Sequence, residues 1–314
     1  MNWLIENVSR KNVLNNCYGL GRSLIAFGML STLLFNRPSY LFPYGKIEGI
    51  ASPQSYDSLL EMLSIFKLFG YENANLARLL CIFILILVII GWRPRFTGFL
   101  HFWVSYSVFI SVLPINGGDQ VSMILTLLLI PVCLLDSRRN HWEDTGEQNH
   151  VIALPNRFKN VTAVTFMNVI RIQVAVIYLI AAVAKFKVPE WINGTALYYW
   201  INHSMFGSSG LVNSLLSPFI QNGVVISLMT WGVLAFELML FSGLLMEKRY
   251  RKPLMFLGFL FHFSIVIIHG LFSFFFAMAG ALVLYLGPIY QGFDLQKTKE
   301  QLNGFKRKFR YSQP

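Results

Sequence analysis

The stretch NVIRIQVAVIYLIAAVAKFKVPEWINGTALYYW, residues 168–200, decides how this chain folds. Its first half is an apolar run interrupted at intervals of seven by Arg171, Tyr178 and Lys185. Because seven residues are close to two helical turns, the three side chains project from one face of the predicted helix. The helix must end near Pro189, where a polar, aromatic-rich segment follows. Charged side chains are costly inside a membrane, so this polar face is the first candidate for a functional site.

The composition of the whole chain excludes a soluble globular protein. Hydrophobic residues make up 55% of the 314 residues and charged residues only 13%, which is typical of a membrane protein. The net charge of +11 comes from basic residues at the ends of apolar runs, so membrane topology explains it and no nucleic-acid partner is expected. The cysteines lie in apolar runs without CxxC spacing, which predicts buried free thiols at Cys17, Cys81 and Cys133.

Eight apolar runs approach the length that is needed to cross a bilayer. Long apolar runs without strand-like alternation predict an all-α fold, a polytopic membrane helix bundle. We expect a cytoplasmic segment at 1–16, a transmembrane domain at 17–288 and a basic cytoplasmic tail at 289–314. The expected spans are residues 17–35, 76–92, 96–114, 119–135, 161–186, 222–246, 253–270 and 271–288.

Basic residues in the short loops predict the orientation of the bundle. They precede the first span and follow the second, fourth and sixth spans, whereas the loop 114–120 has none. The positive-inside rule therefore places both termini in the cytoplasm of a multi-pass protein of the cell membrane, embedded in the lipid bilayer. Residues 56–69 have apolar side chains at helical spacing, which predicts an amphipathic helix on the outer face. That helix is expected to be either a lid packed on the bundle or part of a partner's docking site.

Depth estimates bring three ionisable residues to the bilayer midplane. At about 1.5 Å per residue from the inner ends of their spans, Arg171, Glu237 and His262 each lie ~14–15 Å deep. Arg171 and Glu237 are expected to neutralise one another there, with His262 completing a network. Such a network serves either chemistry or only the packing of the helices. Arg22 lies only ~8 Å from its inner end, so we expect it to snorkel to the cytoplasmic interface.

A second polar layer is predicted toward the outside of the membrane. Tyr178, Lys185 and His269 lie at this level and Asp119 opens the fourth span, so that together with His262 they form a path for protons. A lysine beside a membrane pocket can lose its proton through desolvation and act as a base, or it can simply snorkel at a helix end. Two histidines seven residues apart, without a third ligand nearby, do not predict a metal site.

The run IYLIAAVAK, followed by Trp191, Asn193-Gly194 and an aromatic segment, resembles the signature of the HTTM domain family over roughly residues 15–288. That family includes the vitamin K-dependent γ-carboxylases and sporulation-delaying protein B, and the length and layout here are most similar to the latter. Glu237 and His262 match positions where the family tends to carry a carboxylate and a histidine. Lys185 matches the lysine with which the carboxylases deprotonate vitamin K hydroquinone, so the resemblance to them implies a lysine base and a reduced quinone as cofactor.

Two departures separate this chain from the carboxylases. It has Ala184-Lys185 where they carry a lysine pair, and Gly118 where they carry a histidine, which leaves Asp119 to supply the proton. The chain also lacks their extramembrane domain after the last span. The resemblance to sporulation-delaying protein B implies instead a membrane maturation factor for an exported peptide toxin, a bacteriocin. Its implied partners are the exported precursor peptide and a small protein similar to sporulation-delaying protein A.

Three other functions stay open at this point. The chain could be a stand-alone quinone-dependent membrane enzyme with Lys185 as base, a transporter or a non-catalytic scaffold. A transporter would bind its substrate at the midplane polar layer, but the sequence shows no inverted repeat and no paired broken helices. In either enzymatic reading the candidate catalytic residues are Lys185, Tyr178, His262, Glu237, Arg171, His269 and Asp119.

Overall fold

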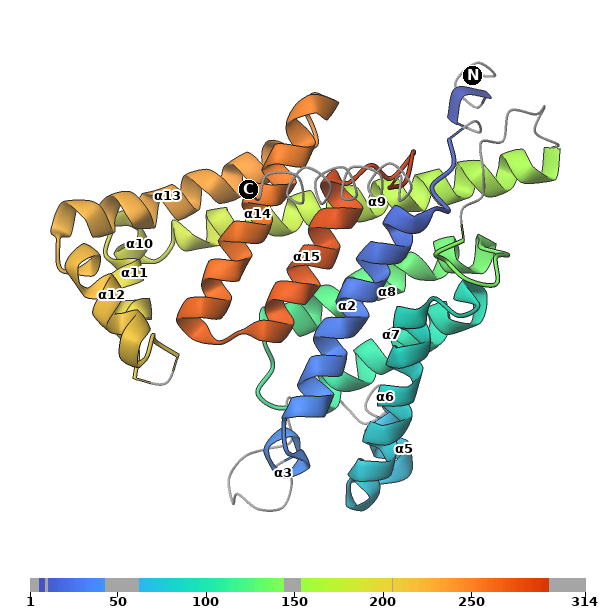
Figure 1. Cartoon of the computed structure of the whole chain (residues 1–314), viewed down its shortest axis with the longest axis horizontal. Coiled ribbons are helices and arrows are strands. Elements are labelled where there is room, and N and C mark those ends of the chain that lie inside the picture. The colour runs from blue at the N-terminus through green and yellow to red at the C-terminus, as the bar shows by residue number, and fades with distance from the viewer. Residues whose placement is uncertain (1–5, 9–10, 43–61, 144–153, 205, 294–314) are drawn as a thin grey trace, which may run out of the picture.

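Each of the eight apolar runs contains one long helix in the computed structural model, which describes residues 6–8, 11–42, 62–143, 154–204 and 206–293 (Figure 1). Within these ranges the chain has no β-strand, only an isolated bridge between Trp92 and Asn140. The fold is therefore an all-α helix bundle, as predicted. The long helices are α2 (Asn16–Phe35), α6 (Ala74–Ile90), α7 (Pro94–Ser111), α8 (Gly117–Leu135), α9 (Leu154–Lys185), α13 (Gly223–Ser242), α14 (Lys248–His269) and α15 (Phe272–Leu286).

Six of the helices in the described ranges are long and apolar enough to cross a membrane, namely α2, α6, α8, α9, α13 and α14. The helix α15 has only 15 residues. The helix α7 is more polar, and its buried side includes Thr97, His101 and Ser105. Several apolar helices in one chain make this a multi-pass membrane protein.

The helices α2 and α15 form the centre of the bundle and pack against each other at very short distance (Figure 1). A Cβ atom at Gly280 would lie 2.6 Å from the carbonyl oxygen of Gly21, and one at Gly28 would lie 2.8 Å from the carbonyl oxygen of Ser273. Small residues of this kind let two membrane helices approach closely. From Ala277 to Leu286, α15 is buried at every position.

The helix that carries the polar face, α9, is 32 residues long. Figure 1 shows it running obliquely across the bundle instead of parallel to α2 and α15. It contacts α8, α13 and α15. This tilt matters for the site, because residues on α9 change depth more slowly along the helix than residues on an upright neighbour.

A segment of short helices joins α9 to α13. It consists of α10 (Pro189–Ile192), α11 (Ala196–Ile201) and α12 (Gly210–Ile220). Pro189 begins α10, so the expected break after the apolar run is confirmed. Two small apolar clusters anchor the segment, one formed by Trp191, Ala196 and Leu234 and the other by Ile201, Ile220 and Ile226.

The first part of the predicted amphipathic helix at 56–69 lies outside the described residues, which resume at 62. The described part contains α5 (Ile65–Phe69), whose Ile65 and Phe66 are 0% exposed and belong to the core with α6 and α7. This burial favours the packed lid over a docking site at Phe66. All three cysteines are buried and free, as expected.

Candidate functional site

The polar face of α9 meets α13 through an ion pair between Lys185 and Glu237. The Nζ atom of Lys185 lies 2.6 Å from Oε1 and 2.8 Å from Oε2 of the carboxylate. The side chain of Glu237 is 8% exposed and that of Lys185 is 22% exposed. A third hydrogen bond runs from Nζ to the carbonyl oxygen of Ala181, at 3.2 Å. Lys185 therefore does not simply snorkel at a helix end, because a buried carboxylate holds it.

The ammonium group of Lys185 is also covered by an aromatic ring. Its Nζ atom lies 5.2 Å from the ring centroid of Trp191, within the range of a cation–π contact. Trp191 belongs to α10, and the indole of Trp231 on α13 donates to the carbonyl oxygen of Ile192 at 3.1 Å. The break after α9 thus turns Trp191 back over the lysine.

Two turns earlier on the same face, Tyr178 forms the second contact of the site. Its hydroxyl shares a hydrogen bond of 2.9 Å with Nε2 of His262 on α14. Both side chains are buried, at 2% and 3% exposed. The other ring nitrogen, Nδ1, is buried and has no hydrogen-bond partner among the described residues. Tyr178 and Lys185 thus connect α9 to α14 and α13 respectively, about 10 Å apart along the helix.

The predicted pairing of Arg171 with Glu237 is wrong. Arg171 is buried, and its Nε atom donates to the carbonyl oxygen of Tyr285 at 3.0 Å, whereas Glu237 pairs with Lys185. The depth estimate failed because it counted along each helix as though all helices stood upright. The obliquely placed α9 and the antiparallel α13 instead meet near the end of α9. Tyr285, which lies in the apolar run ALVLYLG, gave no signal in the sequence.

The outer candidates His269 and Asp119 make other contacts. His269 shares a hydrogen bond of 2.6 Å between its Nδ1 atom and the carbonyl oxygen of Phe206. Asp119 accepts from the backbone N–H of Asn116 at 3.0 Å and completes a capping box at the start of α8. These contacts stabilise local structure, since a capping box satisfies backbone donors at a helix start. Neither bond continues the predicted proton path from His262.

A second buried polar cluster, on α2, was not predicted. Arg22 is 0% exposed, and its Nη2 atom donates to Oγ1 of Thr97 at 2.6 Å. Its Nη1 atom lies 3.5 Å from Nδ1 of His141, whose Nε2 atom lies 3.2 Å from Oγ of Ser23. Burial, together with the guanidinium groups of Arg22 and Arg138, lowers the pKa of His141 to about 2.

The expectation that Arg22 snorkels to the interface is therefore wrong. The loop after α8 folds over the N-terminal part of α2 and places His141 beside the guanidinium group of Arg22. Gly19 makes room for it, since a Cβ atom there would lie 2.8 Å from Cδ2 of the His141 ring. The glycines on either side of Leu20, in the run GLGR, were the available signal for a close contact at this point.

The arrangement around Lys185 does not fit a base for a quinone. A lysine ammonium has three N–H donors and no acceptor. Two of these donors are held by the carboxylate of Glu237 and the third by Ala181. While the pair is closed, no lone pair faces outward to take a proton from a bound hydroquinone.

Comparison with known proteins gives a family and two relatives. Residues 58–288 match the HTTM domain. The chain is 38% identical over 295 residues to the uncharacterized protein YitO of Bacillus subtilis (strain 168), covering 91% of this chain and 92% of that protein. It is 36% identical over 299 residues to the sporulation-delaying protein SdpB of the same organism, covering 94% and 88%. No solved structure matches the chain.

Proposed function

The chain belongs to the HTTM domain family, and we propose that it is a cell-membrane factor in the maturation of an exported peptide. The similarity to sporulation-delaying protein SdpB along nearly the whole chain supports this role. The peptide would be a toxin of the sporulation-delaying kind. The eight helices would all span the membrane, with both termini in the cytoplasm.

The observation that carries the proposal is the buried Lys185–Glu237 pair beside the Tyr178–His262 pair. An ion pair in an apolar bundle is costly to keep unless its geometry and hydrogen bonds are good. Transfer of one proton from Nζ to the carboxylate would give a neutral amine and a carboxylic acid, which are a base and an acid in contact. We propose that the pair exchanges protons with the peptide when it opens.

A small partner protein would dock beside this pair. The short helix α11, in the segment that joins α9 to α13, exposes large aromatic side chains. They include Tyr198, Tyr199 and Trp200, which are 43%, 59% and 46% exposed. Exposed aromatic groups of this kind are enriched at protein interfaces. Trp191 is mostly buried on Lys185 and would not contribute directly.

The test compares the mass of the exported peptide from cells with and without this protein, and with Lys185→Arg. Arginine keeps the charge but does not release a proton under these conditions. We expect loss of the protein or Lys185→Arg to abolish the mature mass, while the variant still inserts into the membrane. Lys187 is exposed two residues further on, so Lys187→Arg is the matched control and should mature the peptide normally. Full maturation with Lys185→Arg would contradict the proton-exchange role.

A further inference from the structure

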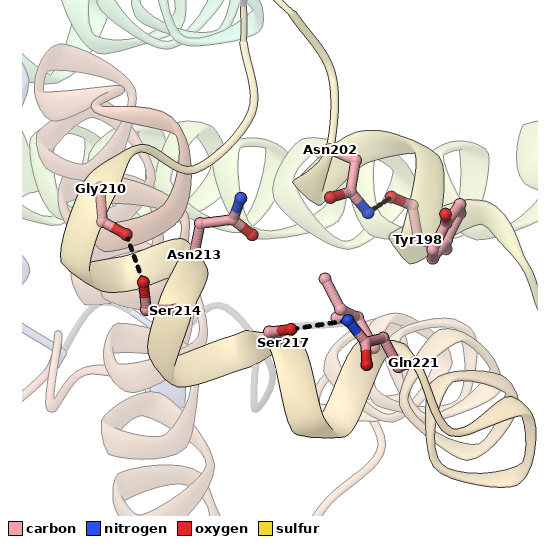
Figure 2. Close-up of a pocket in the computed structure, with 8 residues that line it drawn as sticks. Tyr198, Asn202, Gly210, Asn213, Ser214, Ser217 and Gln221 are labelled. Atoms are coloured by element: carbon pink, nitrogen blue, oxygen red, sulfur yellow. Dashed lines mark hydrogen bonds between the residues drawn. The ribbon is translucent and has the colours of Figure 1, made fainter.

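An open cavity of about 450 Å³ lies in the segment between α9 and α13. Tyr198 and Asn202 come from α11 and its end, and the opposite wall comes from α12 and Gln221 (Figure 2). In Figure 2 the carboxamide of Asn213 extends from α12 into the space between the two walls. The polar lining consists of Tyr198, Asn202, Asn213, Ser214, Ser217 and Gln221. The volume falls within the range of about 300–1,000 Å³ that is usual for ligand sites.

The lining is polar and carries no charged residue. Its internal hydrogen bonds leave part of the carboxamides unused. The Nδ2 atom of Asn202 donates to the carbonyl oxygen of Tyr198, and Nε2 of Gln221 donates to Oγ of Ser217, both at 2.9 Å. The side-chain oxygens of Asn202 and Gln221 accept no hydrogen bond from a described residue, so they are available as acceptors. Asn213 makes no hydrogen bond to a described residue, and its carboxamide extends between the walls of the cavity, where it is available to a ligand (Figure 2).

We propose that this cavity binds the main chain of an extended, uncharged stretch of the precursor peptide. A peptide main chain presents N–H donors and carbonyl acceptors at every residue. Carboxamide side chains offer the same two groups and so match it pairwise. A phosphate or a charged lipid headgroup would lose its hydration here without gaining an opposite charge. The proposal rests on the proposed function, because it names the site at which that peptide would be held.

The cavity is linked to the Lys185–Glu237 pair by one short stretch of chain. Trp191 covers the ammonium group at one end of this stretch, and Tyr198 lines the cavity seven residues later. Ile201 and Ile220 pack together and hold α11 against α12. A peptide bound in the cavity would thus lie at the same end of the bundle as the pair.

The experiment places the photo-crosslinking residue p-benzoylphenylalanine at Tyr198 of the full chain in living cells. After irradiation, the adducts are identified by mass spectrometry and compared with the exported peptide. We expect an adduct with that peptide. The double variant Asn202→Ala, Asn213→Ala should lower its yield at least about fivefold, since two hydrogen bonds are lost. Gln120 is an exposed carboxamide outside the cavity, so Gln120→Ala should leave the yield unchanged.

Lys185→Arg separates this proposal from the proposed function. It should keep the peptide adduct while mature peptide is lost, because binding and proton exchange use different residues. A peptide adduct together with normal maturation in Lys185→Arg would support peptide binding in the cavity and contradict the proposed proton exchange by Lys185. An adduct with a glycan, a lipid or a partner protein in place of the peptide, no adduct, or a yield that the double variant does not change would each overturn the cavity as a peptide site.

Discussion

The ammonium group of Lys185 is satisfied within the protein, and this determines what the residue can do. Two carboxylate oxygens and one carbonyl oxygen accept its three N–H groups. A lysine held in this way can act as a base only after its partner takes the proton or moves away. Glu237 is thus part of any chemistry that Lys185 performs, and the two residues must be tested together.

Exchanging residues of this pair should reveal strong coupling. Glu237→Gln leaves a cation without its counter-charge, and Lys185→Met leaves a buried carboxylate unpaired. We expect each single variant to lower stability by about 1–3 kcal/mol, less than for a fully buried pair because Lys185 is partly exposed. The double variant Lys185→Met, Glu237→Met should cost clearly less than the sum. Thermal melts in detergent measure this, and strict additivity would show that the pair contributes no coupling.

His141 should make the fold sensitive to acid. Its pKa of about 2 in the folded protein lies below the ordinary value of ~6.5 in the unfolded chain. Between these values the unfolded chain binds one more proton, so stability is complete above pH ~6.5 and falls as the pH drops, by about 1.4 kcal/mol per unit.

We therefore expect unfolding midpoints of the wild type to fall faster from pH 7 to pH 5 than those of His141→Gln. Glutamine keeps a polar side chain at this position but does not titrate in this range. The readout is the slope of the unfolding midpoint against pH in the two proteins, not the difference in their stabilities at one pH. Parallel slopes would show that another group controls the acid response.

At the scale of the element, the close packing of α2 on α15 depends on residues without side chains. Gly28 and Gly280 lie where a Cβ atom would meet a backbone carbonyl oxygen of the opposite helix, at 2.8 and 2.6 Å. Backbone atoms cannot move away as a flexible side chain can, so the helices themselves would have to separate. This packing forms the centre on which α8, α9 and α14 rest.

Gly280→Ala should therefore destabilise the bundle although alanine is the better helix former. Its Cβ atom would lie 2.6 Å from both the carbonyl oxygen of Gly21 and Cγ1 of Ile25. Overpacking of this kind costs about 1–3 kcal/mol. Gly232 on α13 has nothing within 4 Å of its Cβ position, so Gly232→Ala is the control and should be neutral or slightly stabilising. Equal melting temperatures for both variants would contradict the close-packing argument.

At the scale of the molecule, the proposed site requires a definite orientation in the membrane. The segment 186–222 must face outward to meet a peptide that leaves the cell, and the loop after α8 must face the cytoplasm. The basic residues of the loops predict this arrangement. The native cysteines are buried, so single exposed cysteines can report it against a low background.

Cysteine labelling tests the orientation directly. Ser209 and Ser137 are both exposed, the first before α12 and the second after α8. A maleimide that does not cross membranes should label Ser209→Cys in intact cells and Ser137→Cys only after the cells are broken. Labelling of both in intact cells would rule out the eight-span arrangement. The reverse pattern would show that the protein has the opposite orientation in the membrane.

The fold class, the positions of the long helices and the polar face of α9 could all be predicted from the amino-acid sequence. These depend on local patterns, namely the length of an apolar run, the spacing of side chains around a helix and the place of a proline. The break at Pro189 and the burial of the three cysteines followed for the same reason.

Which polar groups contact one another could not be predicted from the sequence and required the three-dimensional fold. Glu237 was expected opposite Arg171, because counting residues assigns a depth along a helix but does not give its tilt. The oblique course of α9 brings Lys185 to Glu237, and the loop that carries His141 buries Arg22. The cavity between α11 and α12 likewise arises from two short helices packing on each other. Such contacts join residues far apart in the chain, and no local periodicity records them.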